Sequence, residues 1–145
     1  MELDNKKLFI FDLDGTLVDT APDFKNSLNY MLSEMGEDTV ELSDIRNWVG
    51  YGARELIRRT VEAKNIKHND KKINEMLRIF LLHYTHNIDD DSVLYNNVEN
   101  FLRHLKKNNI KTSVCTNKME SLSIMLLEKL GVLNLFDYLV GGDTF

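Results

Sequence analysis

The stretch "LFIFDLDGTLVDT", from Leu8 to Thr20, contains the strongest structural signal in the sequence. Its first four residues, Leu8–Phe11, form a continuous apolar run, which is typical of a strand buried on both faces in a parallel sheet. Asp12 and Asp14 follow at once, and Gly15 allows the chain to turn sharply. The stretch therefore predicts a buried strand that ends in two closely spaced carboxylates.

The last third of the chain contains the other predicted strands. Residues 110–116 alternate in the pattern of a strand, and residues 136–142 form a shorter apolar segment. Apolar residues at helical spacing predict one helix over 98–105 and a second over 119–130, which ends at Gly131. Strands alternating with helices are typical of a parallel α/β sheet with right-handed crossovers. We therefore predict an α/β fold with a Rossmann-like core of about three strands, incomplete in this chain.

An all-helical insertion separates the first strand from the others. Helical periodicity dominates from Thr20 onward and gives way to the strand pattern after about residue 93. We therefore expect a discontinuous core, residues 1–19 and 94–145, and an inserted helical cap, residues 20–93. The helices predicted in the cap are one from Pro22 to Met35, a short one capped by Ser43 and ending at Arg46, one around 56–61, and one from Asp70 toward the acidic run 89–91.

Composition limits the possible partners. The 145 residues are 43% hydrophobic and carry a net charge of −5, which offers no positive field for nucleic acid or an anionic membrane. No apolar run is long enough to span a membrane, and the N-terminus lacks a secretory signal. Cys115 has no internal partner for a disulfide, so we predict a buried thiol and a cytoplasmic location.

Polar residues follow each predicted strand. Parallel sheets bind ligands at the carboxyl ends of their strands, so the clusters 12–16, 116–118 and 141–143 should converge. Asp12 and Asp14 should face one small volume, where their repulsion favours a bound cation. Mg²⁺ takes such carboxylate ligands, and Gly15 would expose backbone N–H groups to an anion. The residues alone leave a second interpretation open, a turn with purely solvated acidic side chains.

Longer segments resemble a known family. "FDLDGTLVDT" (11–20) is similar to the first motif of the haloacid dehalogenase superfamily of phosphohydrolases, and "VCTNK" (114–118) to its second motif. A helical cap inserted after the first motif is also a property of that superfamily. Within it, "DTAPDF", "WVGYGA", "TNK" and "VGGDTF" resemble segments of bacterial phosphoglycolate phosphatases.

The resemblance implies roles for individual residues. Asp12 would be the nucleophile that forms an aspartyl-phosphate, and Asp14 the general acid and base. Mg²⁺ would be held by the Asp12 carboxylate and the Asp14 main-chain oxygen. Thr116 and the backbone of Gly15 and Asn117 would bind the phosphate. The implied activity is hydrolysis of a small phosphorylated acid, such as 2-phosphoglycolate; another small phosphatase, a pyrophosphatase and a phosphoglucomutase-like transferase are alternatives.

The cap should select the substrate. Residues 48–53 resemble the family's specificity loop, so Gly50, Gly52 and Arg54 are candidate specificity residues, with Arg46 as a further charge partner. The start of the helix after Gly52 would offer free N–H groups to a carboxylate. An ordinary turn between helices is the alternative interpretation.

Two motifs of the family are not found in the sequence. Its lysine motif and its later magnesium-binding aspartates would lie beyond Phe145, so we expect weak or no activity from this chain by itself. A non-catalytic fragment or interaction module that binds Mg²⁺ or phosphate weakly is the second hypothesis. Without a neighbouring strand, Leu8–Phe11 would form an exposed apolar edge through which the chain could self-associate.

Overall fold

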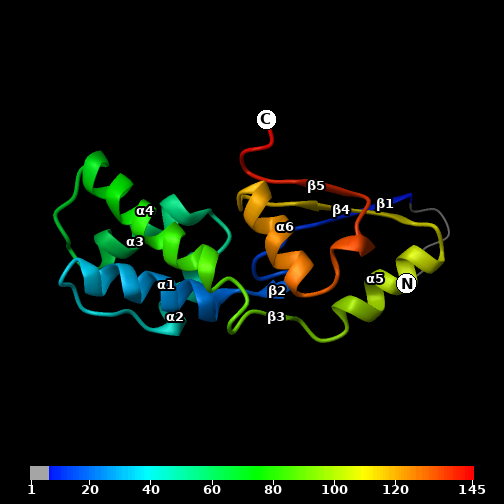
Figure 1. The fold of residues 1–145 in the computed structure, drawn as a ribbon, viewed down its shortest axis with the longest axis horizontal. Coiled ribbons are helices and arrows are strands. Elements are labelled where there is room, and N and C mark those ends of the chain that lie inside the picture. The colour runs from blue at the N-terminus through cyan, green and yellow to red at the C-terminus, as the bar shows by residue number, and fades with distance from the viewer. Residues whose placement is uncertain (1–6) are drawn as a thin grey trace. The chain divides into compact units, whose positions relative to one another are not determined.

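The computed structural model describes residues 7–145, and its residue contacts divide them into two compact units (Figure 1). The first unit runs to Asp19 and resumes over Val93–Phe145. The second is Thr20–Ser92. Each unit is described by itself below. No helix within 7–145 combines the length and the apolar character that crossing a bilayer requires.

The first unit contains a parallel three-stranded sheet. Its strands are β1 (Leu8–Phe11), β4 (Lys111–Cys115) and β5 (Tyr138–Val140), in the order β1-β4-β5. Both pairings are parallel, with Phe11 opposite Val114 and Val114 opposite Leu139. The parallel α/β core predicted from the sequence is therefore confirmed. The carboxyl ends of all three strands lie at one edge, as a binding site at the strand ends requires.

Aromatic contacts hold helices against one face of this sheet. The connecting elements are α5 (Val98–Lys107), α6 (Glu120–Lys129) and the short helix η1 (Leu133–Leu135). The Phe101 ring of α5 lies 5.9 Å from that of Phe9 and 6.3 Å from that of Phe11, both edge to face. Phe136 packs edge-on against Phe11 at 6.5 Å. Edge-to-face aromatic pairs stabilise beyond the area they bury, so this cluster fixes β1 to the helical layer.

Two predictions of burial in this sheet are wrong. The strand Leu8–Phe11 is not buried on both faces, because Leu8 is 46% and Ile10 63% exposed while Phe9 and Phe11 turn toward α5. Cys115 is also exposed rather than buried. The physical reason is that β1 is an edge strand of the described sheet, and that α5 packs on the face of the sheet that carries Phe9 and Phe11. A continuous apolar run cannot show which of its alternating side chains is covered.

A small second sheet was not predicted. β2 (Val18–Asp19) pairs antiparallel with β3 (Val93–Leu94), so Val18 lies opposite Leu94. Strands of two residues are too short to produce a recognisable alternation. They join the segment that leaves the first unit to the segment that returns to it.

The second unit is helical throughout its regular structure. It comprises α1 (Ala21–Glu34), α2 (Leu42–Trp48), α3 (Ala53–Ala63) and α4 (Asp70–His86). The predicted helices are present, but the one expected from Ser43 to Arg46 begins earlier and ends later. The reason is local: the Glu41 N–H donates to the Asp44 carboxylate at 3.3 Å, so Glu41 rather than Ser43 precedes the first turn. Phe24, Phe80 and Tyr84 form the aromatic centre of the unit.

A buried carboxylate closes the second unit on itself. Asp23, in the first turn of α1, is 1% exposed. Its carboxylate accepts the N–H of Asp91 at 3.0 Å and that of Ser92 at 2.8 Å. The Asp91 backbone is therefore held by α1, although the residue itself is exposed. These bonds fix the last residues of the unit against its first helix.

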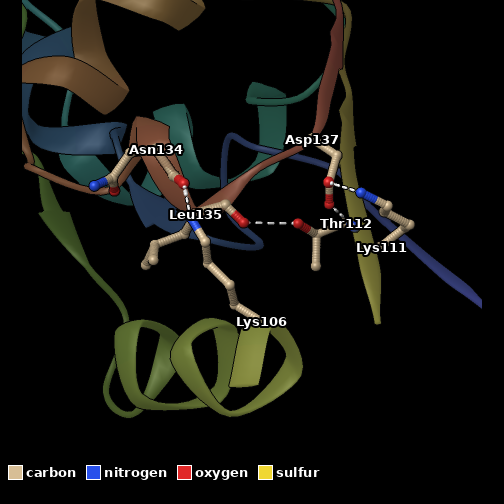
Figure 2. Close-up of polar contacts among 6 residues, drawn as sticks. All are labelled: Lys106, Lys111, Thr112, Asn134, Leu135 and Asp137. Atoms are coloured by element: carbon tan, nitrogen blue, oxygen red, sulfur yellow. Dashed lines mark hydrogen bonds and ion pairs between the residues drawn. The ribbon is translucent and has the colours of Figure 1, made fainter. Parts of the chain in front are cut away.

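Polar contacts also fasten the amino-terminal ends of β4 and β5 (Figure 2). The Asp137 carboxylate accepts the Lys111 ammonium at 2.6 Å and the Thr112 N–H at 2.9 Å, and the Thr112 hydroxyl donates to the Leu135 carbonyl at 2.8 Å. Lys106 donates to the Asn134 carbonyl at 2.5 Å. A hollow of about 240 Å³ lies here. Its charged lining groups already have partners, because Lys111 pairs with Asp137 and Lys106 donates to the Asn134 carbonyl. We therefore assign it a structural role.

This cluster gives the fold a predictable dependence on pH. Lys111 and the Thr112 N–H hold the pKa of the Asp137 carboxyl below its usual value of 3.8. A depressed carboxyl pKa stabilises the fold above the unfolded-state value, and that stabilisation is lost as the pH falls through the folded-state value. Asp137→Asn should therefore lower the free energy of unfolding by more at neutral pH than at about pH 3. Urea unfolding at both pH values checks this, with the exposed Asp38→Asn as a control; an equal loss at both would contradict it.

Candidate functional site

The first site residues lie on a tight turn that follows β1. The Leu13 carbonyl accepts the backbone N–H groups of Thr16, Leu17 and Val18 at 3.2, 3.0 and 3.1 Å. Gly15 adopts a φ of 78°, a conformation that residues with a side chain rarely adopt. The glycine thus allows the chain to reverse directly after the second carboxylate.

The two carboxylates have different surroundings. Asp12 is exposed, and its Oδ1 accepts the N–H of Leu13 at 2.7 Å. Asp14 is 9% exposed. A nucleophile must be reached by its substrate, whereas partial burial suits a group that exchanges protons. The sequence predicted both residues at the site but not this difference.

The end of β4 carries the next site residues. Thr116 is 9% exposed, and its backbone N–H donates to the Val140 carbonyl at 3.0 Å, which ties it to the end of β5. Its hydroxyl oxygen accepts the N–H of Lys118 at 3.3 Å. Asn117, between them, has an exposed side chain. The predicted convergence of this segment with β5 is thus present in the structure.

Glycine is required where β5 ends. A Cβ on Gly142 would lie 2.6 Å from the Asn117 carbonyl oxygen, and one on Gly141 would lie 2.6 Å from the Glu120 Cα. Both distances are shorter than real carbon contacts. The Gly142 N–H donates to the Lys118 carbonyl at 2.9 Å. These close approaches hold the backbone after β4 in place.

Lys118 connects the turn after β1 to the end of β4. Its ammonium lies 3.0 Å from Asp14 Oδ1 and 3.2 Å from Asp14 Oδ2, and the two side chains are 4% and 7% exposed. The sequence placed Lys118 in the cluster at the strand end but gave it no role. Its position two residues after Thr116 was an available signal. Its pairing partner, more than one hundred residues away in the sequence, could not be identified.

Opposing effects act on this lysine. Burial lowers the pKa of Lys118, while the charges of Asp14 and Asp12 and the hydrogen bond to Asp14 act to raise it. A buried ammonium can keep its charge where a carboxylate pairs with it and offsets the cost of removing it from water. Lys118 pairs with Asp14 and donates its N–H to the Thr116 hydroxyl, and Asp12 follows β1 beside the end of β4. The structure therefore brings Asp12, Asp14, Thr116 and Lys118 into one site.

The oxygen atoms at the site suit a small, hard cation. Asp14 Oδ1 is buried and, although ion-paired with Lys118, accepts no hydrogen bond from the described residues. Mg²⁺ binds through one or two carboxylates and completes its coordination with water and phosphate oxygens. Groups of three or more His, Cys, Asp or Glu able to hold a metal are absent from residues 7–145. The Asp12 carboxylate and the oxygen atoms of Asp14 are the groups at this site that could hold such a cation.

The predicted specificity residues lie in the other unit. Gly50 and Gly52 have φ values of 100° and 86°, and Gly52 precedes the first turn of α3. Arg54 is exposed and donates to Asn74. Within the same loop, Tyr51 is 60% exposed, and the Arg59 guanidinium lies over its ring at 4.1 Å.

Comparison with known proteins agrees with this arrangement. A family model described as haloacid dehalogenase-like hydrolase matches residues 9–145. A phosphoglycolate phosphatase of Colwellia psychrerythraea is 40% identical over 149 residues, covering 99% of this chain and 65% of the relative. One of Mesorhizobium japonicum is 37% identical over 141 residues, covering 97% of this chain and 62% of the relative.

Solved structures share the fold. The crystal structure of a predicted phosphoglycolate phosphatase from Haemophilus somnus matches with a TM-score of 0.91 and 29% identity, over 99% of this chain and 66% of that one. The chain thus spans less than two thirds of the length of these proteins. The match over residues 9–145, nearly the whole chain, together with the two motifs at the strand ends, shows that the chain belongs to the haloacid dehalogenase-like hydrolase family.

Proposed function

We propose that the protein is a Mg²⁺-dependent phosphomonoester hydrolase that acts on a small phosphorylated acid, with 2-phosphoglycolate as the first candidate. The observation that carries this proposal is the meeting of exposed Asp12, buried Asp14 and Thr116 at the ends of β1 and β4. The names of the relatives that are 36–40% identical support the choice of substrate.

Asp12 acts as the nucleophile in this proposal. One of its carboxylate oxygens attacks phosphorus, the bond between phosphorus and the ester oxygen breaks, and an aspartyl-phosphate forms. Exposure leaves the carboxylate open to a substrate, and the N–H of Leu13 holds the other oxygen, Oδ1. Splitting one displacement into two lets the same site activate first the ester and then water.

Asp14 acts as the general acid and base in this proposal. Its carboxyl group donates a proton to the departing alkoxide and then accepts one from the water that hydrolyses the aspartyl-phosphate. The Thr116 hydroxyl and nearby backbone N–H groups hydrogen-bond the phosphoryl oxygens as charge accumulates there. Asp12 and Asp14 would hold Mg²⁺, which when bound draws electron density from the phosphoryl group.

A substrate panel tests the proposal. The purified chain is incubated with Mg²⁺ and, in turn, 2-phosphoglycolate, other small phosphomonoesters, a sugar phosphate and pyrophosphate, and released phosphate is measured. We expect 2-phosphoglycolate to give the highest kcat/KM and EDTA to remove the activity. We expect slow turnover from a protein of these 145 residues, since they contain no counterpart of the family's later lysine and aspartate motifs. Binding of Mg²⁺ without hydrolysis of any of these compounds would favour the non-catalytic alternative.

Further proposals concern the partners and the cellular location of the protein. The exposed Leu8 and Ile10 on edge strand β1 support self-association through this edge. The negative net charge supports a protein without nucleic acid as a partner. The single cysteine, which has no internal partner for a disulfide, supports a cytoplasmic location.

A further inference from the structure

Lys118 provides a buried positive charge in a site otherwise formed by carboxylates and hydroxyl groups. Its side chain is 4% exposed, and its ammonium contacts both oxygens of the Asp14 carboxylate. Lysine side chains are seldom buried, since removing the charge from water is costly unless a partner compensates. The pair therefore defines where the Asp14 carboxylate lies.

The backbone of Lys118 is held independently of its side chain. Its N–H donates to the Thr116 hydroxyl, and its carbonyl accepts the Gly142 N–H at 2.9 Å. Both partners follow strands of the sheet. The ammonium is thus anchored on the rigid end of β4, whereas Asp14 lies on a turn.

We infer that Lys118 is a positioning residue that holds the Asp14 carboxylate at the edge of the sheet and sets the charge met by an incoming cation or phosphate. The inference rests on the proposed function, because it is this function that gives Asp14 its role. Lys118 acts through Asp14 rather than on the reacting atoms.

Opposite changes in two affinities follow from this position. Two carboxylates and one ammonium leave the site with a single net negative charge. Removing the ammonium should strengthen the binding of Mg²⁺ and weaken that of inorganic phosphate. A side chain that merely supported the fold would weaken both when removed. The sign of the Mg²⁺ change therefore separates positioning from general support.

Calorimetric titration of the full chain tests the inference. Lys118→Met should bind Mg²⁺ about tenfold more tightly than the wild type, and inorganic phosphate, titrated at saturating Mg²⁺, about tenfold more weakly. Lys118→Arg, which retains the charge, should restore values near those of the wild type. Lys107→Met removes an exposed lysine of α5 and controls for net charge. A folded Lys118→Met variant with unchanged or weaker Mg²⁺ binding would overturn the inference.

A double variant covers the case in which Lys118→Met does not fold. Loss of the ammonium leaves the Asp14 carboxylate buried without its partner, and Asp14→Asn removes that charge as well. If the combined variant folds where Lys118→Met does not, the pairing is supported. If it also fails to fold, Lys118 serves packing and the inference is wrong.

Stability measurements separate this inference from the proposed function. If the wild type binds no Mg²⁺, the proposed function fails in its metal requirement, and the pair is then judged by urea unfolding. Asp14→Asn and Lys118→Met should then each lower the free energy of unfolding. The double variant should lose less stability than the sum of the two single losses, because each single substitution already breaks the same ion pair. Strictly additive losses would overturn the role of Lys118, whatever the activity of the protein.

Discussion

Replacing Asp12 by asparagine is expected to lower Mg²⁺-dependent phosphate release by at least about 10³-fold. An amide oxygen is a far poorer nucleophile than a carboxylate, and the substitution also removes one negative charge that would hold the metal. Asp12 is exposed, and its Oδ1 accepts the Leu13 N–H at 2.7 Å, a bond that the Asn oxygen can retain. Activity should therefore fall without a comparable loss of stability. Phosphate release and thermal unfolding, measured on the same sample, check both expectations.

A matched substitution gives the control for Asp12. Asp38 is exposed on the loop between α1 and α2, and Asp38→Asn makes the same chemical change outside the site. It should leave both activity and stability near those of the wild type. If Asp12→Asn retained more than a tenth of the wild-type rate, Asp12 would not be the nucleophile.

Replacing Asp14 by asparagine should have a different kinetic signature. Without the general acid, release of an alkoxide from 2-phosphoglycolate should slow by about 10²–10⁴-fold. A nitrophenolate needs no proton to leave, so p-nitrophenyl phosphate should still transfer its phosphoryl group. Hydrolysis of the aspartyl-phosphate would remain slow, since it needs the same residue as a base. We therefore expect a burst of nitrophenol close to one equivalent of enzyme, followed by slow turnover.

Stopped-flow absorbance measures this burst. Because Lys118 pairs with Asp14, folding of the variant must be verified by circular dichroism before the kinetics are compared. The Asp12→Asn variant should give no burst and serves as the negative control. Equal losses with both substrates and no burst from Asp14→Asn would exclude Asp14 as the general acid and base.

The fold could be predicted from the sequence where local pattern and topology agree. The apolar run Leu8–Phe11 and the alternation around Val114 predicted parallel strands, and their pairing is confirmed. Helical periodicity also predicted the helices of the second unit. Burial within the strands was less predictable, since exposure of Ile10 and Cys115 depends on which face α5 covers.

The composition of the site could be predicted in part. The convergence of Asp12, Asp14 and Thr116 could be predicted because polar residues at the carboxyl ends of parallel strands meet at one edge, whereas their chemical roles belong to the proposed function. The ion pair of Lys118 with Asp14 could not be found, since its partners are far apart in sequence and neither carries a distinctive spacing. The buried bonds of Asp23 to the backbone of Asp91 and Ser92 escaped prediction for the same reason.

Chemical trapping of the phosphorylated residue tests the central claim most directly. The protein is mixed with Mg²⁺ and 2-phosphoglycolate, quenched, and reduced with borohydride, which converts an aspartyl-phosphate to homoserine. Peptide mass spectrometry then locates the change. We predict homoserine at position 12 and unmodified aspartate at position 14. Phosphate release accompanied by unmodified Asp12, or by phosphate on another residue, would contradict the account.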